Sequence, residues 1–188
     1  MTAFEQAIIF AVRAHEGQRR RGESTPYIIH PMEVAAICAS MTSDEDVLAA
    51  AVLHDTVEDT NATLEQIEAQ FGARVARLVA AETENKRANL PPAETWRIRK
   101  QESLEDLKSS TDPGVKILWL GDKLANIRSF YRAWQRRGHE LWSDFNQKDP
   151  AQQAWYYRTI TALLSDLKEH AAWQELRDDV ERIFEGVN

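Results

Sequence analysis

The sequence has few of the residues that form disulfides and tight turns. Its 188 residues include one cysteine, seven glycines and six prolines. The lone Cys38 excludes an intramolecular disulfide and a cysteine-based zinc site, and a reduced thiol is typical of a cytoplasmic protein. Because glycine and proline build most turns, their scarcity disfavours a β-rich fold. We therefore expect a mainly helical protein in the cytoplasm.

Long hydrophobic runs and an excess of positive charge are also missing. No apolar run approaches the roughly 18 residues that a membrane helix needs. The N-terminus is amphipathic and carries Glu5, which is not typical of a signal peptide. The net charge of −7 argues against a general nucleic-acid binder. We therefore expect neither membrane nor nucleic acid as a partner.

Apolar residues recur at helical spacing along most of the chain, and strand signals are nearly absent. This pattern predicts an all-α fold, a bundle of about eight to ten helices. At roughly 100 to 200 residues per domain, the length predicts a single domain over residues 1–188. Expected helices include 3–15, 44–59, 93–109, 150–170 and 172–185.

Three sets of polar residues are typical of helix starts. Thr42 with Glu45, and Thr63 with Gln66, have the spacing of a capping box, in which each side chain bonds the backbone N–H of the other residue. Asp112 followed by a proline is typical of the start of a long helix. These signals predict where three of the helices begin.

The stretch LHDTVEDT places one histidine and three carboxylates directly after an apolar run. On a continuous helix over 44–59, His54 would lie above Glu58 and Asp55 above Asp59, because residues four apart share a face. Carboxylates near a helix C-terminus oppose the macrodipole, so a cation would stabilise them. These residues alone leave two interpretations open, which are a packed core histidine with solvated acids and a cation site.

Two further polar residues lie in apolar surroundings. The expected long helix has apolar residues on both sides of Asp122, and an unpaired buried carboxylate is costly. Singly, Asp122 fits a salt bridge and His30 fits a packing role. Together, two histidines and two aspartates make an N2O2 set that suits Mn²⁺, Fe²⁺ or Zn²⁺. That set is His30, His54, Asp55 and Asp122.

Three consecutive arginines, Arg19, Arg20 and Arg21, lie in a glycine-flanked loop just upstream of His30. The guanidinium fork matches the geometry of a phosphate group. In an acidic protein, such a loop suggests phosphate recognition, although a solvated basic loop explains it as well.

Four motifs occur in the order seen in one family: HEGQRRR…TPYIIHP, LHDTVEDT, FGARVARLV and GDKLANIRS. In them the chain resembles the HD-domain (p)ppGpp hydrolases, which are the RelA/SpoT-type hydrolase domains and the stand-alone small alarmone hydrolases. The resemblance covers about residues 4–130. It implies an all-α HD bundle with one Mn²⁺ that removes the 3′-pyrophosphate from guanosine tetra- or pentaphosphate.

The resemblance also implies a role for each matching residue. Arg21 stands where the family usually has lysine, and the segment 132–150 is longer than in the small hydrolases, so both departures concern the substrate. The implied metal ligands are His30, His54, Asp55 and Asp122, the catalytic pair is Glu58 and Asp59, and the substrate contacts are Arg20, Arg21, Asn126 and Tyr156.

Two alternatives stay open beside this interpretation. The first is an HD phosphohydrolase that acts on another nucleotide, such as a deoxynucleoside monophosphate or the 2′-phosphate of NADPH. The second is a module that binds an alarmone without cleaving it.

Overall fold

The chain is all-α in the part that the structure describes. This structure is a computed structural model, and it describes residues 1–20, 24–87 and 89–187. In those residues it has ten α-helices and two 3₁₀ helices, and its only extended pairing is an isolated bridge between Arg19 and Pro26. The predicted fold class is therefore confirmed. Among the described residues, no helix is long and apolar enough to cross a membrane.

The chain divides into two compact units. Unit 1 consists of Met1–Thr83 with Ser110–Asp122, and unit 2 consists of Glu84–Ser109 with Lys123–Asn188. One long helix, α8 (Pro113–Arg137), contributes its first part to unit 1 and the rest to unit 2. The single domain expected over 1–188 stays a prediction.

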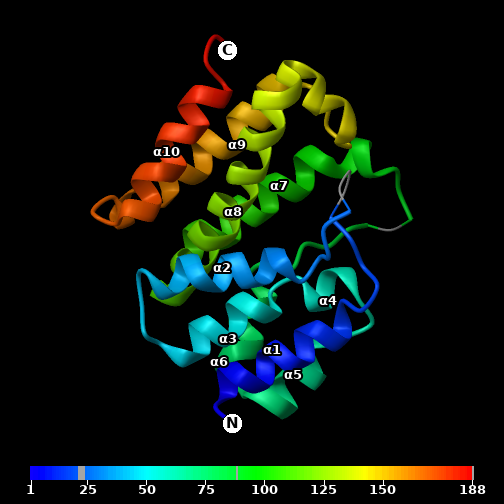
Figure 1. The fold of residues 1–188 in the computed structure, drawn as a ribbon, viewed down its shortest axis with the longest axis vertical. Coiled ribbons are helices and arrows are strands. Elements are labelled where there is room, and N and C mark those ends of the chain that lie inside the picture. Colours follow the sequence, from blue (N-terminus) through cyan, green and yellow to red (C-terminus); the bar gives the residue numbers. More distant parts are fainter. Residues whose placement is uncertain (21–23, 88, 188) are drawn as a thin grey trace. The chain divides into compact units, whose positions relative to one another are not determined.

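Unit 1 is organised around the buried helix α3, which packs against α1, α2 and α6 (Figure 1). Val47 and the five residues from Ala49 to Leu53 are almost fully buried, as the unbroken apolar run predicts. Besides the start of α8, the helices of unit 1 are α1 (Ala3–Ala14), α2 (Ile29–Ala39), α3 (Glu45–Leu53), α4 (Thr56–Asp59), α5 (Leu64–Phe71) and α6 (Ala73–Ala80).

The prediction of one continuous helix over 44–59 is wrong, because the helix is interrupted between α3 and α4. Two side chains bond the last carbonyl groups of α3, which closes this helix end. His54 Nδ1 lies 2.8 Å from the carbonyl oxygen of Ala51, and the Thr56 hydroxyl donates to the carbonyl of Leu53 at 2.7 Å. The break turns the polar end of LHDTVEDT into a short separate helix.

The three predicted helix starts have different outcomes. Thr63 and Gln66 form the predicted capping box of α5. The Asp112 carboxylate accepts a hydrogen bond at 2.8 Å from the backbone N–H of Gly114, the second residue of α8, as an N-cap does. The capping box of Thr42 with Glu45 is wrong. Instead Asp44 caps α3, and the Thr42 hydroxyl accepts a hydrogen bond from the backbone N–H of Asp44.

Arg74 of α6 connects the start of α3 to the start of α8. Its Nη1 lies 2.7 Å from Asp44 Oδ2 and 3.2 Å from Asp46 Oδ2, at the start of α3. Its Nε lies 3.2 Å from Asp112 Oδ2, at the start of α8. One guanidinium group therefore bonds three carboxylates and holds the two helix starts at a fixed separation.

Gly121 of α8 allows a close approach of α8 to α2. A Cβ atom built at this position would lie 2.6 Å from Cys38 Sγ and 3.2 Å from the carbonyl oxygen of Val34, both on α2. Such distances are shorter than real carbon contacts, so only glycine fits here without a shift. The neighbouring residue on α8 is Asp122.

Cys38 should not react with thiol reagents in the folded protein. Burial raises the pKa of its thiol to about 12, and the charges of Glu82 and Asp122 add to this effect. At pH 8 only about one thiol in 10,000 would then be the reactive thiolate. We expect an aromatic disulfide reagent to label the protein fully in guanidinium chloride but not in native buffer. Rapid labelling of the native protein would contradict the burial of this side chain.

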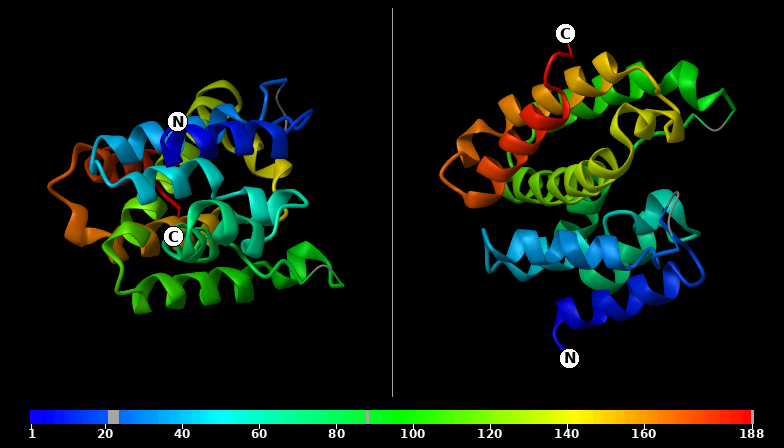
Figure 2. Two further views of the ribbon diagram at one scale, coloured as in Figure 1. Left: turned by 90° about the horizontal axis from the view of Figure 1, so that it is seen from below. Right: turned by 45° about the horizontal axis from the view of Figure 1, so that its top comes forward.

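Unit 2 contains the remaining helices, and α9 packs against both α7 and α10. The views in Figure 2 agree with Figure 1 that α9 and α10 lie side by side. Besides the rest of α8, the elements are α7 (Pro92–Ser109), the 3₁₀ helix η1 (Gly138–Asp144), α9 (Pro150–Leu163), the 3₁₀ helix η2 (Ser165–Leu167) and α10 (Ala171–Ile183).

A buried charge cluster stabilises the start of unit 2. Arg99 Nη1 lies 2.6 Å from Glu84 Oε2, and both side chains are about nine-tenths buried. Lys100 bonds the other oxygen of the same carboxylate. Burial raises the pKa of Glu84, but the charge and hydrogen bond of Lys100 outweigh it, so the pKa lies below its ordinary value. Glu84 is therefore ionised wherever unit 2 is folded near neutral pH.

This cluster predicts a specific dependence of stability on pH. Because the folded pKa of Glu84 lies below the unfolded value of about 4.3, its contribution is complete above that pH and is lost as the pH falls through the folded pKa. We expect Glu84→Gln to lower the free energy of unfolding by about 3 kcal/mol at pH 7. In urea titrations, this difference should shrink below about pH 4. The exposed Glu105→Gln on α7 is the control, and an equal, pH-independent loss in both variants would refute the prediction.

Candidate metal centre

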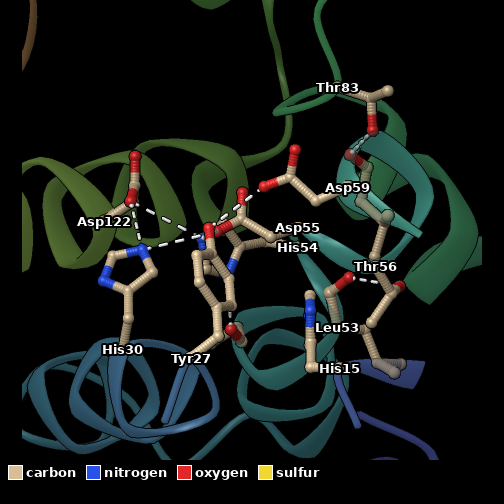
Figure 3. Close-up of polar contacts among 12 residues, drawn as sticks. His15, Tyr27, His30, Leu53, His54, Asp55, Thr56, Asp59, Thr83 and Asp122 are labelled. Atoms are coloured by element: carbon tan, nitrogen blue, oxygen red, sulfur yellow. Dashed lines mark hydrogen bonds and ion pairs between the residues drawn. The ribbon is translucent and has the colours of Figure 1, made fainter. Parts of the chain in front are cut away.

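Four of the residues singled out in the sequence meet in unit 1 (Figure 3). His30 Nε2 lies 3.1 Å from Asp122 Oδ1 and 3.5 Å from Asp55 Oδ2. His54 Nε2 lies 3.0 Å from Asp55 Oδ2 and 3.5 Å from Asp122 Oδ1. Two imidazole nitrogens and two carboxylate oxygens therefore converge on one point.

Three helix regions position these side chains. His30 lies in the first turn of α2, His54 directly follows α3, Asp55 precedes α4, and Asp122 lies on α8. Both histidines and Asp122 are buried, while the Asp55 side chain is 19% exposed. The two adjacent residues point to the same centre because the chain turns between α3 and α4.

The donor set fits a divalent cation. The bond of His54 Nδ1 to the Ala51 carbonyl requires a proton on Nδ1, so that Nε2 carries a free lone pair in the neutral ring. This Nε2 atom is fully buried, and the atoms that face it are carboxylate oxygens, which cannot donate a hydrogen bond to its lone pair. One ligand atom from each of His30, His54 and Asp122 lies within 4.8 Å of the others. A metal ion is the partner that such a nitrogen lacks.

The charges of the site stabilise one another. Burial lowers the pKa of His54, but the charge of Asp55 and hydrogen bonds with both aspartates outweigh it and raise the pKa well above its ordinary value. Burial raises the pKa of Asp55, but the charges and hydrogen bonds of the histidines hold it well below the ordinary value. In both cases the protein favours a positive charge between the two carboxylates, which is the charge that a cation would supply.

The predicted catalytic pair lies on α4, next to the four clustered residues. Glu58 is half-buried and Asp59 is exposed at the last position of the helix. The Tyr27 hydroxyl lies 2.7 Å from Asp55 Oδ2 and 3.1 Å from Asp59 Oδ2. Burial and the charges of the two aspartates raise the pKa of Tyr27 well above its ordinary value, so its hydroxyl stays a donor.

The predicted substrate residues fall in different parts of the chain. Arg20 is half-buried in unit 1, with its guanidinium carbon 5.6 Å from the centre of the Tyr27 ring. Arg21 lies outside the described residues. Asn126 belongs to the part of α8 in unit 2. Tyr156 of α9 is buried in unit 2, with the Lys100 ammonium 4.8 Å from the centre of its ring.

Two residues beside the site were not singled out in the sequence, namely Tyr27 and Gln18. Gln18 Nε2 donates to the backbone carbonyl of Asp59 at 2.8 Å, and Tyr27 contacts the side chain of the same residue. Both lie in the stretch HEGQRRR…TPYIIHP. An aromatic residue three positions before a site histidine was the only signal, and it does not distinguish packing from a polar contact.

Comparison with known families gives this site a context. A family model described as the HD domain matches residues 7–151. The chain is 44% identical over 130 residues to the human guanosine-3′,5′-bis(diphosphate) 3′-pyrophosphohydrolase MESH1, a match that covers 68% of this chain and 69% of MESH1. It is 37% identical over 127 residues to the Aquifex aeolicus guanosine-3′,5′-bis(diphosphate) 3′-pyrophosphohydrolase, covering 68% of this chain and 18% of that protein.

Two solved structures are also similar to this chain. A structure described as a metazoan ortholog of SpoT that hydrolyzes ppGpp is 29% identical, with a TM-score of 0.74 over 97% of this chain and 95% of that one. A crystal structure from Listeria monocytogenes is 34% identical, with a TM-score of 0.71 over 82% of this chain and 98% of that one. The chain thus belongs to the HD domain family and, within it, to the guanosine-3′,5′-bis(diphosphate) 3′-pyrophosphohydrolases that include MESH1.

Proposed function

We propose that this chain is a metal-dependent hydrolase that removes the 3′-pyrophosphate from guanosine 3′,5′-bis(diphosphate) and its pentaphosphate form, with Mn²⁺ as the metal. The observation that carries the proposal is the buried His54 Nε2, whose lone pair faces two carboxylates and a second imidazole. A mixed imidazole and carboxylate set suits Mn²⁺ better than Mg²⁺. The names of the MESH1 and Aquifex relatives support the substrate.

His30, His54, Asp55 and Asp122 would hold the ion. When bound, a divalent ion supplies Lewis-acid chemistry, in which a phosphoryl oxygen is polarised and the pKa of water is lowered. Asp59, held by the Tyr27 hydroxyl, would take the proton of the attacking water and orient that water toward the 3′-phosphorus. Glu58, one position earlier on α4, would share this role.

The substrate-binding roles rest on the resemblance to the family and on residue chemistry. Arg20 carries a guanidinium group beside the Tyr27 ring, close to the proposed metal ligands, and such a group suits a nucleotide phosphate or base. For Arg21, Asn126 and Tyr156 we propose contacts with the nucleotide on the resemblance alone.

A nucleotide panel tests the proposal. The purified protein is freed of metal, reloaded with Mn²⁺, Mg²⁺ or Zn²⁺, and incubated with guanosine tetraphosphate and pentaphosphate, NADPH and deoxynucleoside monophosphates. We expect release of pyrophosphate from the two guanosine nucleotides, with the fastest turnover in Mn²⁺. A chelator added before the substrate should abolish this release.

The panel also separates the alternatives. Fast phosphate release from NADPH or a deoxynucleoside monophosphate, with neither guanosine nucleotide cleaved, would overturn the proposed substrate. The proposed metal-dependent hydrolysis would still hold. Tight binding of guanosine tetraphosphate without turnover in any metal would favour a binding module. Faster turnover in Zn²⁺ or Mg²⁺ than in Mn²⁺ would overturn only the assignment of Mn²⁺ as the metal.

A further inference from the structure

We propose that Tyr27 and Gln18 are positioning residues, which together hold Asp59 in the orientation that the reaction needs. This inference rests on the proposed function, because it assigns to Asp59 a role in handling the proton of water. It concerns two residues that contact Asp59. Four sets of contacts within unit 1 support it.

The first is the hydroxyl group of Tyr27. It lies 2.7 Å from Asp55 Oδ2 and 3.1 Å from Asp59 Oδ2, so one oxygen atom contacts carboxylates at both ends of α4. Asp55 is a proposed metal ligand and Asp59 is the proposed catalytic carboxylate. The hydroxyl therefore sets the distance between the metal site and the group that acts on water (Figure 3).

The second is the packing of the Tyr27 ring, which leaves it little freedom to turn away. The ring centre of buried His15 lies 4.8 Å away, and that of His30 lies 6.0 Å away in an edge contact. The guanidinium carbon of Arg20 lies 5.6 Å from the ring centre. Because these groups surround the ring, its hydroxyl is held in place before any substrate binds.

The third is the side-chain amide of Gln18, which bonds at both of its ends. Its Nε2 donates to the backbone carbonyl of Asp59 at 2.8 Å, and its Oε1 lies 2.8 Å from His15 Nδ1. Because Gln18 holds the backbone of Asp59 while Tyr27 contacts its side chain, the two residues act on different parts of the same group.

The fourth is the backbone that joins the two positioning residues. The Tyr27 N–H donates to the Gln18 carbonyl at 3.0 Å, and the Arg20 N–H donates to the Thr25 carbonyl at 3.0 Å. This pairing joins the backbone of Gln18 directly to that of Tyr27. Asp59 needs such support because it is exposed at the end of a four-residue helix, which has too few internal hydrogen bonds to fix its own last residue.

The test begins with Tyr27→Phe, which removes one oxygen atom and keeps the ring. At saturating Mn²⁺ we expect kcat to fall about 10- to 100-fold, while KM changes less than about threefold. The control is Tyr131→Phe, since Tyr131 lies on α8 in unit 2 and stacks on Trp134. This control should keep the wild-type kcat. Gln18→Ala should also lower kcat without weakening Mn²⁺ binding, because its side chain does not contact a proposed ligand.

A double-mutant cycle with Asp59→Asn decides the mechanism. If Tyr27 acts through Asp59, then Tyr27→Phe should lower kcat less than about threefold in the Asp59→Asn background. If Tyr27→Phe lowers kcat by the same factor with and without Asp59→Asn, the proposal is overturned. Such a result would mean that the effect of Tyr27 on kcat does not depend on Asp59, as expected for a merely structural role. Full recovery of Tyr27→Phe by excess Mn²⁺ would also overturn it, since the tyrosine would then act only on the ligand Asp55.

The cycle is run with whichever nucleotide the wild type cleaves fastest. A failure of the proposed substrate therefore leaves this test intact. If Asp59→Asn alone keeps the wild-type kcat, then the proposed catalytic role of Asp59 fails, and the positioning proposal fails with it. If Asp59→Asn is impaired and the cycle shows no coupling, only the positioning proposal fails.

Discussion

Replacing His54 with alanine should lower the turnover of guanosine 3′,5′-bis(diphosphate) by at least about 1,000-fold, because the loss of one ligand removes the ion on which the reaction depends. The same variant should bind Mn²⁺ at least about 100-fold more weakly than the wild type. Titration of the apo protein with Mn²⁺, followed by electron paramagnetic resonance, measures this affinity directly. Steady-state pyrophosphate release measures the turnover.

The matched control is His170→Ala. His170 precedes α10 in unit 2 and makes no capping hydrogen bond with its side chain. It should leave both metal affinity and turnover unchanged. Circular dichroism checks that the His54 variant keeps its helices, since this variant also loses the bond from Nδ1 to the carbonyl of Ala51. A His54 variant that retains wild-type metal content and turnover would refute the proposed metal centre.

Replacing Gly121 with alanine should disturb the site without changing any of the proposed metal ligands. The added Cβ would lie 2.6 Å from Cys38 Sγ, so α8 and α2 must move apart. Overpacking of this kind costs about 2 kcal/mol of stability. Asp122 is the next residue on α8, and His30 lies on α2. We therefore expect the variant to bind Mn²⁺ at least about 10-fold more weakly, in addition to unfolding at lower urea concentration.

A second substitution tests this explanation. Cys38→Ala removes the sulfur atom that the new methyl group meets, so the pair Gly121→Ala with Cys38→Ala should recover most of the metal affinity lost in Gly121→Ala. Cys38→Ala alone should cost little affinity. Because the two side chains are in contact, their effects should not add. Additive losses in the double variant would show that Gly121 matters for another reason, such as the backbone of Val34.

The fold class was predictable from the sequence because helical periodicity is a local property of the chain. The burial of α3 followed from its unbroken apolar run. The break after His54 did not, because periodicity continues through LHDTVEDT and the bonds that end α3 are made by two side chains. The start of α3 was also ambiguous, since Thr42 and Asp44 are both good caps and lie two residues apart. The division into two units was not visible, because α8 passes from one to the other as one continuous helix.

The site was predictable to a different degree. The imidazole and carboxylate set could be assembled from residues with apolar neighbours and from the order of the family motifs, and the structure brings all four side chains together. Tyr27 could not be recognised, because the role proposed for it depends on a hydroxyl group that contacts residues about 30 positions later in the chain. A phenol in an apolar stretch predicts packing equally well. The position of Asp59 depends on such long-range contacts, which periodicity and composition do not encode.

Unit 1 is discontinuous in the chain, and this has a consequence for how the protein is made. During synthesis, His30, His54 and Asp55 leave the ribosome together with the first segment of unit 1, whereas Asp122 follows only after the whole of α7, which belongs to unit 2. The nascent chain therefore presents an incomplete set of ligands while it is being extended. The proposed metal centre would be completed by Asp122, the last residue of unit 1 to be synthesised, so full metal affinity would appear only after α7 has been made.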